Sequence, residues 1–338
     1  MEVYLTVDTE CTEERLIRGT IRPPLGYDLM MRGRFDGYAS GFGTDLIVRA
    51  LGQYGFQATF FVETLCTEFF GVEGLAAVCR DLLTSGQDIQ LHLHPNFRKP
   101  EWRHQGQQPV SDNIGDYSLQ EQETFLRTGI EVLVSAGVPR SSIAAFRAGN
   151  YGANNVTWQA LRNVGLSVDS SFNLWAVGKD CQIVAHGTPN DLYEPIPGVW
   201  ELPITCFSEA RGYRHLEIAA VSAAEMRHAL RQLRQAGARA ATIVTHPGEF
   251  FVVDDRERRR GRPNTINIAR LRSLLAFLDG SRNHFEVRTV GWLGNIVQKG
   301  RIAGRREPMV IPRGSSMRRT ARLPMQAIKR YIMRPRLS

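Results

Sequence analysis

The chain has 338 residues, of which 43% are hydrophobic and 9% aromatic, and this composition excludes a disordered or fibrous protein. It carries 42 Lys and Arg against 34 Asp and Glu, but residues 299–338 hold 12 of the basic residues and only one acidic residue. Residues 1–298 are therefore slightly acidic, which argues against nucleic acid as a partner, because phosphate binding needs a dense positive face on the folded body.

Short β-branched and aromatic runs alternate with longer segments of helical period. Strands are predicted at Val3–Val7, Ala58–Val62, Asp88–Leu93, Ile143–Arg147, Leu166–Asp169, Val199–Ile204, Ala241–Thr245 and Phe285–Val290. Helices are predicted at Asp45–Tyr54, Gly74–Leu83, Leu119–Ala136, Thr157–Val164, Ala223–Ala236 and Ile266–Leu278. This alternation is typical of parallel strands joined by helices, and the absence of a Rossmann fingerprint favours a (β/α) barrel over an open sheet.

Cysteine usage and the N-terminal segment predict a cytoplasmic location. The five cysteines form no CxxC pair, which is typical of reduced thiols. Residues 1–8 lack a positively charged stretch followed by an apolar one, and the chain has no run of 18 apolar residues.

Ionisable side chains stand at the ends of five predicted strands, and these are Asp8 and Glu10, His92 and His94, Arg147, Asp169 and His246. In a parallel barrel these ends share one face, and residues two apart in a strand point to the same side. Two imidazoles and one carboxylate can hold a divalent metal and leave room for water. Taken alone, each group has a structural explanation as a loop acid, a core histidine or an ion pair. Their joint placement indicates a site, because buried charge is costly unless it is paired or bound to metal.

Seven motifs, in this order along the chain, resemble the polysaccharide deacetylase family (NodB-homology domain, carbohydrate esterase family 4). They are Thr6-Val-Asp8-Thr-Glu10, Ala58-Thr-Phe-Phe-Val62, Gly86-Gln-Asp-Ile-Gln-Leu-His92-Leu-His94-Pro95, Phe146-Arg147-Ala-Gly-Asn-Tyr151-Gly152, Val168-Asp169-Ser170-Ser171, Glu201-Leu-Pro203 and Thr245-His246-Pro247. The resemblance is closest to intracellular members of bacterial surface-polysaccharide biosynthesis. It implies an irregular (β/α)7 barrel over residues 1–298 and a metal-dependent hydrolase that removes an N-acetyl or O-acyl group from a sugar.

The resemblance also implies a role for each candidate residue. Asp8 is expected to be the catalytic base held by Arg147, the Tyr151 region to supply an oxyanion-binding N–H, and His246 to be the catalytic acid oriented by Asp169. Glu10, His92 and His94 are expected to bind a divalent metal, with Zn²⁺ first and Mn²⁺ or Co²⁺ acceptable.

The motifs also depart from the family pattern. Asp8-x-Glu10 replaces the paired aspartates, so either carboxylate could be the metal ligand. The two histidines are two apart instead of four; Asn96 occupies the fourth position, and His104 is an alternative to His94.

Two other functions remain open: a related amidohydrolase, such as a deformylase or small-ureide hydrolase, and a non-catalytic glycan- or membrane-binding descendant.

Arginine is concentrated in three loops that follow predicted strands, at residues 11–43, 95–118 and 246–264. Arginine binds phosphate in a bidentate fork, so we expect a nucleotide- or lipid-diphosphate sugar as substrate, against the alternative of solvated loop charges.

Residues 299–338 are expected to form a separate basic tail. Apolar residues at helical spacing from Met325 to Met333 predict weak contact with the anionic inner membrane, or else a disordered solubilising tail.

Overall fold

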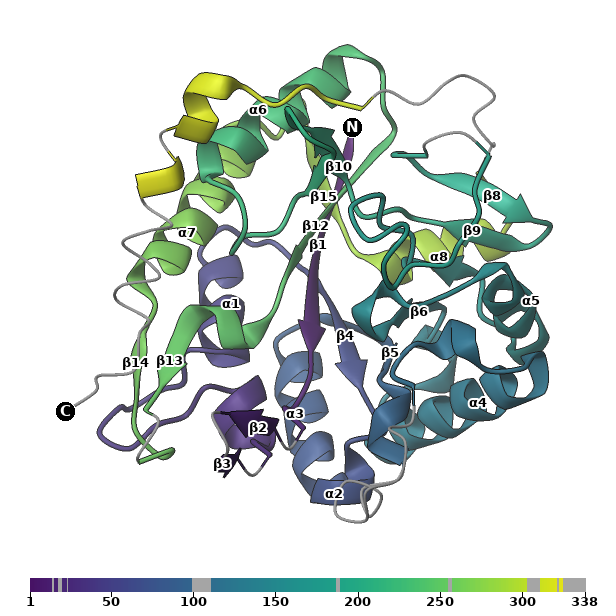
Figure 1. Ribbon diagram of the computed structural model, residues 1–338, viewed down its shortest axis with the longest axis vertical. Coiled ribbons are helices and arrows are strands. Elements are labelled where there is room, and N and C mark those ends of the chain that lie inside the picture. Colours follow the sequence, from purple (N-terminus) through teal and green to yellow (C-terminus); the bar gives the residue numbers. More distant parts are fainter. Residues whose placement is uncertain are drawn as a thin grey trace.

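The computed structural model describes residues 1–13, 15–17, 20–22, 24–98, 111–186, 189–254, 257–302, 311–320 and 322–324 (Figure 1). The strands are β1 (Glu2–Thr9), β2 (Arg15–Ile17), β3 (Thr20–Arg22), β4 (Thr59–Glu63), β5 (Asp88–Leu93), β6 (Ala145–Ala148), β7 (Val168–Asp169), β8 (Tyr193–Ile196), β9 (Val199–Glu201), β10 (Cys206–Ser208), β11 (Tyr213–His215), β12 (Ala240–Thr245), β13 (Phe251–Val253), β14 (Gly261–Pro263) and β15 (Glu286–Arg288). The α-helices are α1 (Thr44–Gly52), α2 (Thr67–Phe70), α3 (Val72–Thr84), α4 (Leu119–Ser135), α5 (Asn155–Val164), α6 (Ala223–Gln235), α7 (Thr265–Asp279) and α8 (Val290–Gln298).

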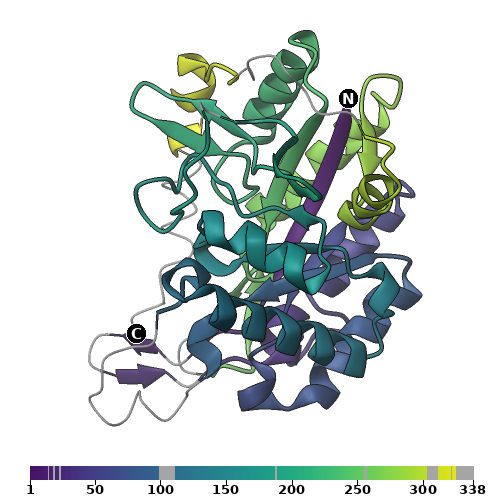
Figure 2. The same cartoon turned by 90° about the vertical axis from the view of Figure 1, so that its right-hand side faces the viewer.

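The main sheet is a curled, mostly parallel sheet with helices outside it (Figures 1 and 2). Its strands follow the order β12-β1-β4-β5-β6-β7-β9-β8, with β15 also paired to β1. Every pairing from β12 to β9 is parallel, and β8 is antiparallel to β9. The predicted irregular (β/α)7 barrel is therefore confirmed. Between β9 and β12 the sheet is replaced by single bridges, such as Glu217 with Val244.

Side chains alternate between the inside and the outside of this barrel. Tyr4, Phe61, Val168 and Trp200 belong to one buried cluster, which α8 joins through three apolar side chains, Val290, Leu293 and Val297. Their strand neighbours, such as Val3 and Phe60, pack in the second, larger cluster with the surrounding helices. The barrel interior is thus filled with apolar side chains at one end, and polar side chains remain at the C-terminal ends of the strands.

The part of the C-terminal segment that the structure describes lies against α6, where Figure 1 shows it in yellow. Arg313 forms a parallel bridge with Ser208 of β10, and its backbone bonds to the Gln232 side chain of α6. The Arg322 side chain is 2% exposed and forms ion pairs with Glu209 and Glu225. Residues 311–320 and 322–324 of the predicted basic tail are therefore packed against β10 and α6. The expected amphipathic stretch from Met325 onwards lies outside the described residues.

No helix within the described ranges combines the length and the apolar character that crossing a membrane requires.

Candidate active site

The C-terminal ends of the parallel strands bring the predicted residues together. Asp8 is in β1, with Glu10 just after it, and His92 pairs in register with Arg147 across β5 and β6. His246 follows directly after β12, which pairs with β1. Strands far apart in the sequence thus place these groups on one face, as expected of a parallel barrel.

Glu10, His92 and His94 form a cluster that can hold a metal ion. Each offers one ligand atom, and the three atoms lie within 4.8 Å of one another. Glu10 Oε2 is 3.4 Å from His92 Nε2 and 2.8 Å from His94 Nε2. The predicted convergence of Glu10 with the histidine pair is confirmed. The structure groups Glu10, and not Asp8, with the histidines; Asn96 instead donates to Glu13, and His104 lies outside the described residues.

The second nitrogen of each histidine is held from behind. His92 Nδ1 lies 2.8 Å from the Arg147 carbonyl oxygen, and His94 Nδ1 lies 2.8 Å from Asp112 Oδ2. A carbonyl oxygen can only accept, so His92 carries its proton on Nδ1 and turns the lone pair of Nε2 towards Glu10. A lone pair facing a carboxylate oxygen fits a cation between them, and two imidazoles with a carboxylate suit Zn²⁺, Mn²⁺ or Co²⁺.

The loop after β6 approaches the histidine pair closely. A Cβ on Gly149 would lie 2.6 Å from the His94 ring, so only glycine fits there. Asn150 and Tyr151 follow with positive φ angles of 54° and 61°, a conformation that non-glycine residues rarely adopt. Asn150 also donates to Asp112 Oδ2, which ties this loop to the partner of His94.

Asp8 and Arg147 form a buried ion pair beside the cluster. Arg147 Nη1 lies 2.5 Å from Asp8 Oδ1, and the two side chains are 0% and 3% exposed. The guanidinium also donates to Thr6 Oγ1, to Ser170 Oγ and to the Ser170 carbonyl, and it lies 4.2 Å above the ring of Phe61. Asp8 Oδ1 is thus occupied by Arg147, while Oδ2 faces His246 Nε2 at 3.8 Å.

Asp169 does not contact His246, and the prediction that it orients this histidine is wrong. Asp169 Oδ1 accepts from the hydroxyl and the N–H of Ser171, and its carboxyl pairs with that of Glu201. Burial raises the pKa of Asp169, and burial with the nearby Asp169 charge raises that of Glu201 well above its usual value. Val168 occupies the barrel interior, so strand alternation points the next residue, Asp169, outwards.

Two glutamates that the sequence analysis missed occupy the place expected for Asp169. His246 Nδ1 is 2.9 Å from Glu249 Oε1 and 3.7 Å from Glu217 Oε1. Burial lowers the pKa of His246, but the neighbouring carboxylates, led by Glu249, outweigh burial and raise it to about 10. Glu249 could have been noticed three residues after His246, whereas Glu217 comes from an irregular segment that gives no sequence signal.

Several arginines of the three loops form ion pairs with carboxylates of the same chain. These pairs are Arg32 with Asp28 and Asp81, Arg34 with Asp45, Arg259 with Asp36 and Arg260 with Glu257. A guanidinium held by a carboxylate is less available to phosphate. The side chains at Arg15, Arg22 and Arg98, and residues 99–110, lie outside the described part.

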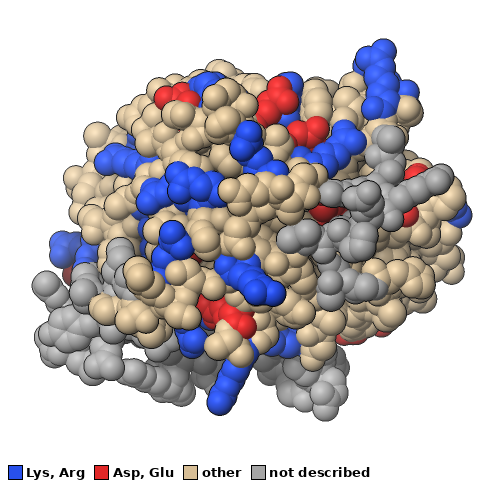
Figure 3. Space-filling view, turned by 90° about the horizontal axis from the view of Figure 1, so that it is seen from above, with Lys and Arg blue, Asp and Glu red and all other residues tan. Residues whose placement is uncertain are grey.

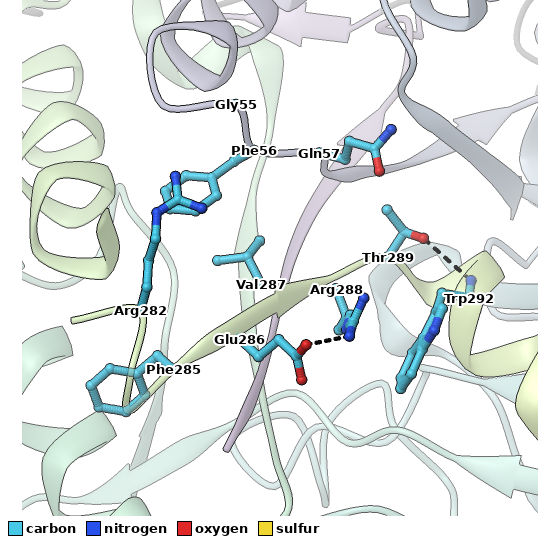
Figure 4. A pocket seen from close by; sticks show the side chains of 10 residues that line it. All are labelled: Gly55, Phe56, Gln57, Arg282, Phe285, Glu286, Val287, Arg288, Thr289 and Trp292. Atoms are coloured by element: carbon cyan, nitrogen blue, oxygen red, sulfur yellow. Dashed lines mark hydrogen bonds and ion pairs between the residues drawn. The ribbon is translucent and has the colours of Figure 1, made fainter. Parts of the chain in front are cut away.

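A separate pocket of about 310 Å³ lies at the opposite end of the barrel (Figure 4). It is built around the start of β15 and the residues before β4. Its two arginines lie against aromatic rings, Arg282 at 4.5 Å from Phe56 and Arg288 at 4.6 Å from Trp292. This pocket contains none of the predicted site residues.

Comparison with solved structures identifies the fold. A Mycobacterium smegmatis protein described as a polysaccharide deacetylase aligns with a TM-score of 0.51 and 18% identity, over 80% of this chain and 81% of that one. A family 4 carbohydrate esterase from Streptomyces lividans in complex with acetate gives 0.39 and 12%, over 84% and 89%. A family 4 acetyl xylan esterase from Clostridium thermocellum in complex with a cobalt ion gives 0.42 and 16%, over 89% and 92%. No protein-family model and no curated protein matches the sequence.

The first of these alignments shows that the chain has the NodB-like fold of the polysaccharide deacetylases. The fold implied by the resemblance of the sequence motifs is therefore confirmed. The roles of the site residues stay predictions.

Proposed function

We propose that the protein is a metal-dependent hydrolase that removes an N-acetyl or O-acyl group from a sugar or glycan precursor in surface-polysaccharide biosynthesis. The observation that carries this proposal is the cluster of Glu10, His92 and His94 beside the Asp8–Arg147 pair, on the C-terminal face of a deacetylase fold. This arrangement suits acyl hydrolysis, because Asp8, His246 and the three candidate metal ligands lie on the same face.

Glu10, His92 and His94 would hold the metal, which when bound polarises an acyl carbonyl and lowers the pKa of water. Arg147 and Asp112 fix the two imidazoles from behind through their Nδ1 atoms. Such outer partners orient the ligands before the metal arrives, and they keep each Nε2 directed at the cluster.

Asp8 would act as the base. Arg147 binds Oδ1 and leaves Oδ2 facing His246 Nε2 at 3.8 Å. There Oδ2 would take a proton from the attacking water. The guanidinium holds Asp8 in one orientation, so the reacting oxygen does not have to be ordered during the reaction.

His246 would act as the acid. Its Nε2 faces Asp8 Oδ2, and its Nδ1 is held by a carboxylate. In amide hydrolysis the departing amine nitrogen needs a proton, because a bare amide anion is a poor leaving group. The backbone N–H groups of the strained turn at Asn150 and Tyr151 would bind the developing oxyanion.

The direct test is acetate release from N-acetylated sugars by the purified protein, before and after chelation and after Zn²⁺, Mn²⁺ or Co²⁺ is restored. We expect metal-dependent release, and Asp8→Asn should lower kcat by about 10² to 10⁴. Free sugars and their diphosphate conjugates should be compared in the same assay, and equal kcat/KM for both would exclude phosphate recognition by the loops. Failure to release acetate from any of them, with metal bound, would overturn the proposal.

We also propose that the protein works in the cytoplasm at the inner membrane surface. Basic side chains are spread over the end of the molecule that carries α6 and the described C-terminal residues (Figure 3). Burial and the nearby charges of Arg318 and Arg231 lower the pKa of His228 on α6. Each basic residue near an anionic surface contributes about 1 kcal/mol. We expect co-sedimentation with anionic vesicles at low but not at high salt. Equal sedimentation of a chain ending at Gly300 would show that the residues after Gly300 are not what binds the membrane.

A further inference from the structure

The imidazole of His246 lies between two glutamates and the catalytic base. Nδ1 is 2.9 Å from Glu249 Oε1 and 3.7 Å from Glu217 Oε1, whereas Nε2 is 3.8 Å from Asp8 Oδ2. When Glu249 is ionised, its carboxylate can only accept, so the short contact then places a proton on Nδ1. The ring is therefore oriented with Nδ1 towards the glutamates and Nε2 towards the site.

The second oxygen of each glutamate is also held. Thr245 Oγ1 donates to Glu249 Oε2 at 2.6 Å, and His215 Nε2 lies 3.1 Å from Glu217 Oε2. Each carboxylate thus presents one oxygen to His246 and is anchored through the other. This arrangement prevents either carboxylate from rotating away from Nδ1 without breaking a second contact.

The backbone around both glutamates is fixed by further bonds. The Glu249 carbonyl accepts from the side-chain amides of Asn264 and Asn267. Glu217 forms a parallel bridge with Val244 of β12, and Arg270 binds the next carbonyl along the chain. Glu249 is thus tied to the start of α7, and Glu217 is tied to β12, the strand that His246 directly follows.

We propose that Glu249 and Glu217 are positioning residues that hold His246 as a proton donor, with Glu249 binding Nδ1 directly and Glu217 lying 3.7 Å from the same nitrogen. The inference rests on the proposed function, and it gives these two residues the task that the sequence motif assigned to Asp169. In the proposed hydrolysis, water supplies the oxygen of the released acid and the C–N bond breaks. The amine takes the proton of Nε2. The proton of Nδ1 stays on the imidazole and remains hydrogen-bonded to Glu249.

The leaving group provides a readout that a structural role would not change. An amine must be protonated as it departs, whereas 4-nitrophenolate departs without a proton from the enzyme. Loss of the orienting carboxylate should therefore impair an N-acetylated sugar far more than 4-nitrophenyl acetate. We expect Glu249→Gln to lower kcat for the amide by about 10²-fold and Glu217→Gln by about 10-fold, with less than about 3-fold change for the ester.

A double-variant comparison shows whether Glu249 acts through the histidine. If it does, His246→Ala with Glu249→Gln should be no slower on the amide than His246→Ala alone. Glu257→Gln, which removes an exposed carboxylate further along the same loop, is the matched control and should change neither rate. Metal content should be the same in all these proteins, which separates positioning from metal binding.

Two results would overturn the inference. One is that Glu249→Gln lowers kcat equally for the amide and the ester. The other is that the double variant is slower on the amide than His246→Ala by the same factor as that by which Glu249→Gln alone slows the wild type. A third measurement needs no activity: histidine NMR spectra should show a hydrogen-bonded Nδ1–H of His246, and its ¹H resonance should shift upfield in Glu249→Gln, because a neutral amide oxygen is a weaker acceptor than a carboxylate. If the wild-type protein shows this signal but hydrolyses neither substrate, the proposed function fails while the orientation of His246 stands; absence of the signal overturns the inference itself.

Discussion

Arg147 is the residue on which the buried polar part of the barrel depends. Its side chain is fully buried, yet every nitrogen has an acceptor, and one of these acceptors is the carboxylate of Asp8. The ring of Phe61 lies beneath the guanidinium and separates it from the apolar end of the barrel. The charges of Asp8 and Arg147 therefore neutralise each other and are hydrogen-bonded by the protein, which is the condition for keeping charge in a core.

Replacing Arg147 by alanine should cost both stability and activity, because it leaves the Asp8 carboxylate buried without its countercharge. We expect a loss of about 3 to 5 kcal/mol in the free energy of unfolding, measured by urea denaturation. Arg282→Ala removes a half-exposed arginine paired with Asp279 and should cost less than about 1 kcal/mol. Similar losses for the two variants would contradict this account of the buried pair.

The sequence predicted which residues gather at the site better than it predicted their partners. Glu10, His92 and His94 converge because strand alternation and parallel topology are both readable from the pattern. The same alternation explains the error at Asp169, since Val168 before it faces the barrel interior. Glu217 could not be predicted, because an isolated bridge and not a regular strand brings it to His246.

At the scale of elements, the eight predicted strands and six predicted helices all have counterparts, because their periodicity is long and regular. Helix α8 was not predicted, and only its first residue, Val290, falls within the strand predicted at Phe285–Val290. Its sequence is apolar on most sides, since it packs against the apolar interior of the barrel and lacks the polar face that marks a surface helix. The short hairpins β10–β11 and β13–β14 were missed because three-residue strands carry little pattern.

The docked C-terminal segment supplies a prediction about stability. Arg322→Ala leaves Glu225 and Glu209 without their buried partner and should cost about 3 kcal/mol in urea unfolding at pH 7. Arg319→Ala, one turn away on the same segment, is the control and should cost little. Equal effects would show that the segment is not anchored by Arg322.

The same contact predicts a dependence on pH. Burial raises the pKa of Glu209, but Arg322 and Arg214 outweigh burial and lower it below its usual value. A carboxylate with a depressed pKa stabilises the fold above its unfolded pKa of about 4.3, and this contribution is lost as the pH falls through the folded value. The difference in stability between wild type and Arg322→Ala should therefore shrink below about pH 4. A constant difference down to pH 3 would contradict the ion pair.

At the scale of the whole molecule, the two ends of the barrel have different chemistry. One end is filled by α8 and apolar side chains, and the other collects the histidines, the buried ion pair and the glutamates around His246. Strand order places these groups together although they lie more than 230 residues apart in the chain. The polar end is therefore the place where a metal and an acyl sugar would meet.

Metal content tests the central claim most directly. The protein, loaded with Zn²⁺ and passed through a desalting column, should hold one ion per chain by elemental analysis, and so should Asp8→Asn. His92→Ala, His94→Ala and Glu10→Ala should each lose it, because each removes one of three ligands. Retention of a full equivalent in both histidine variants would contradict the account.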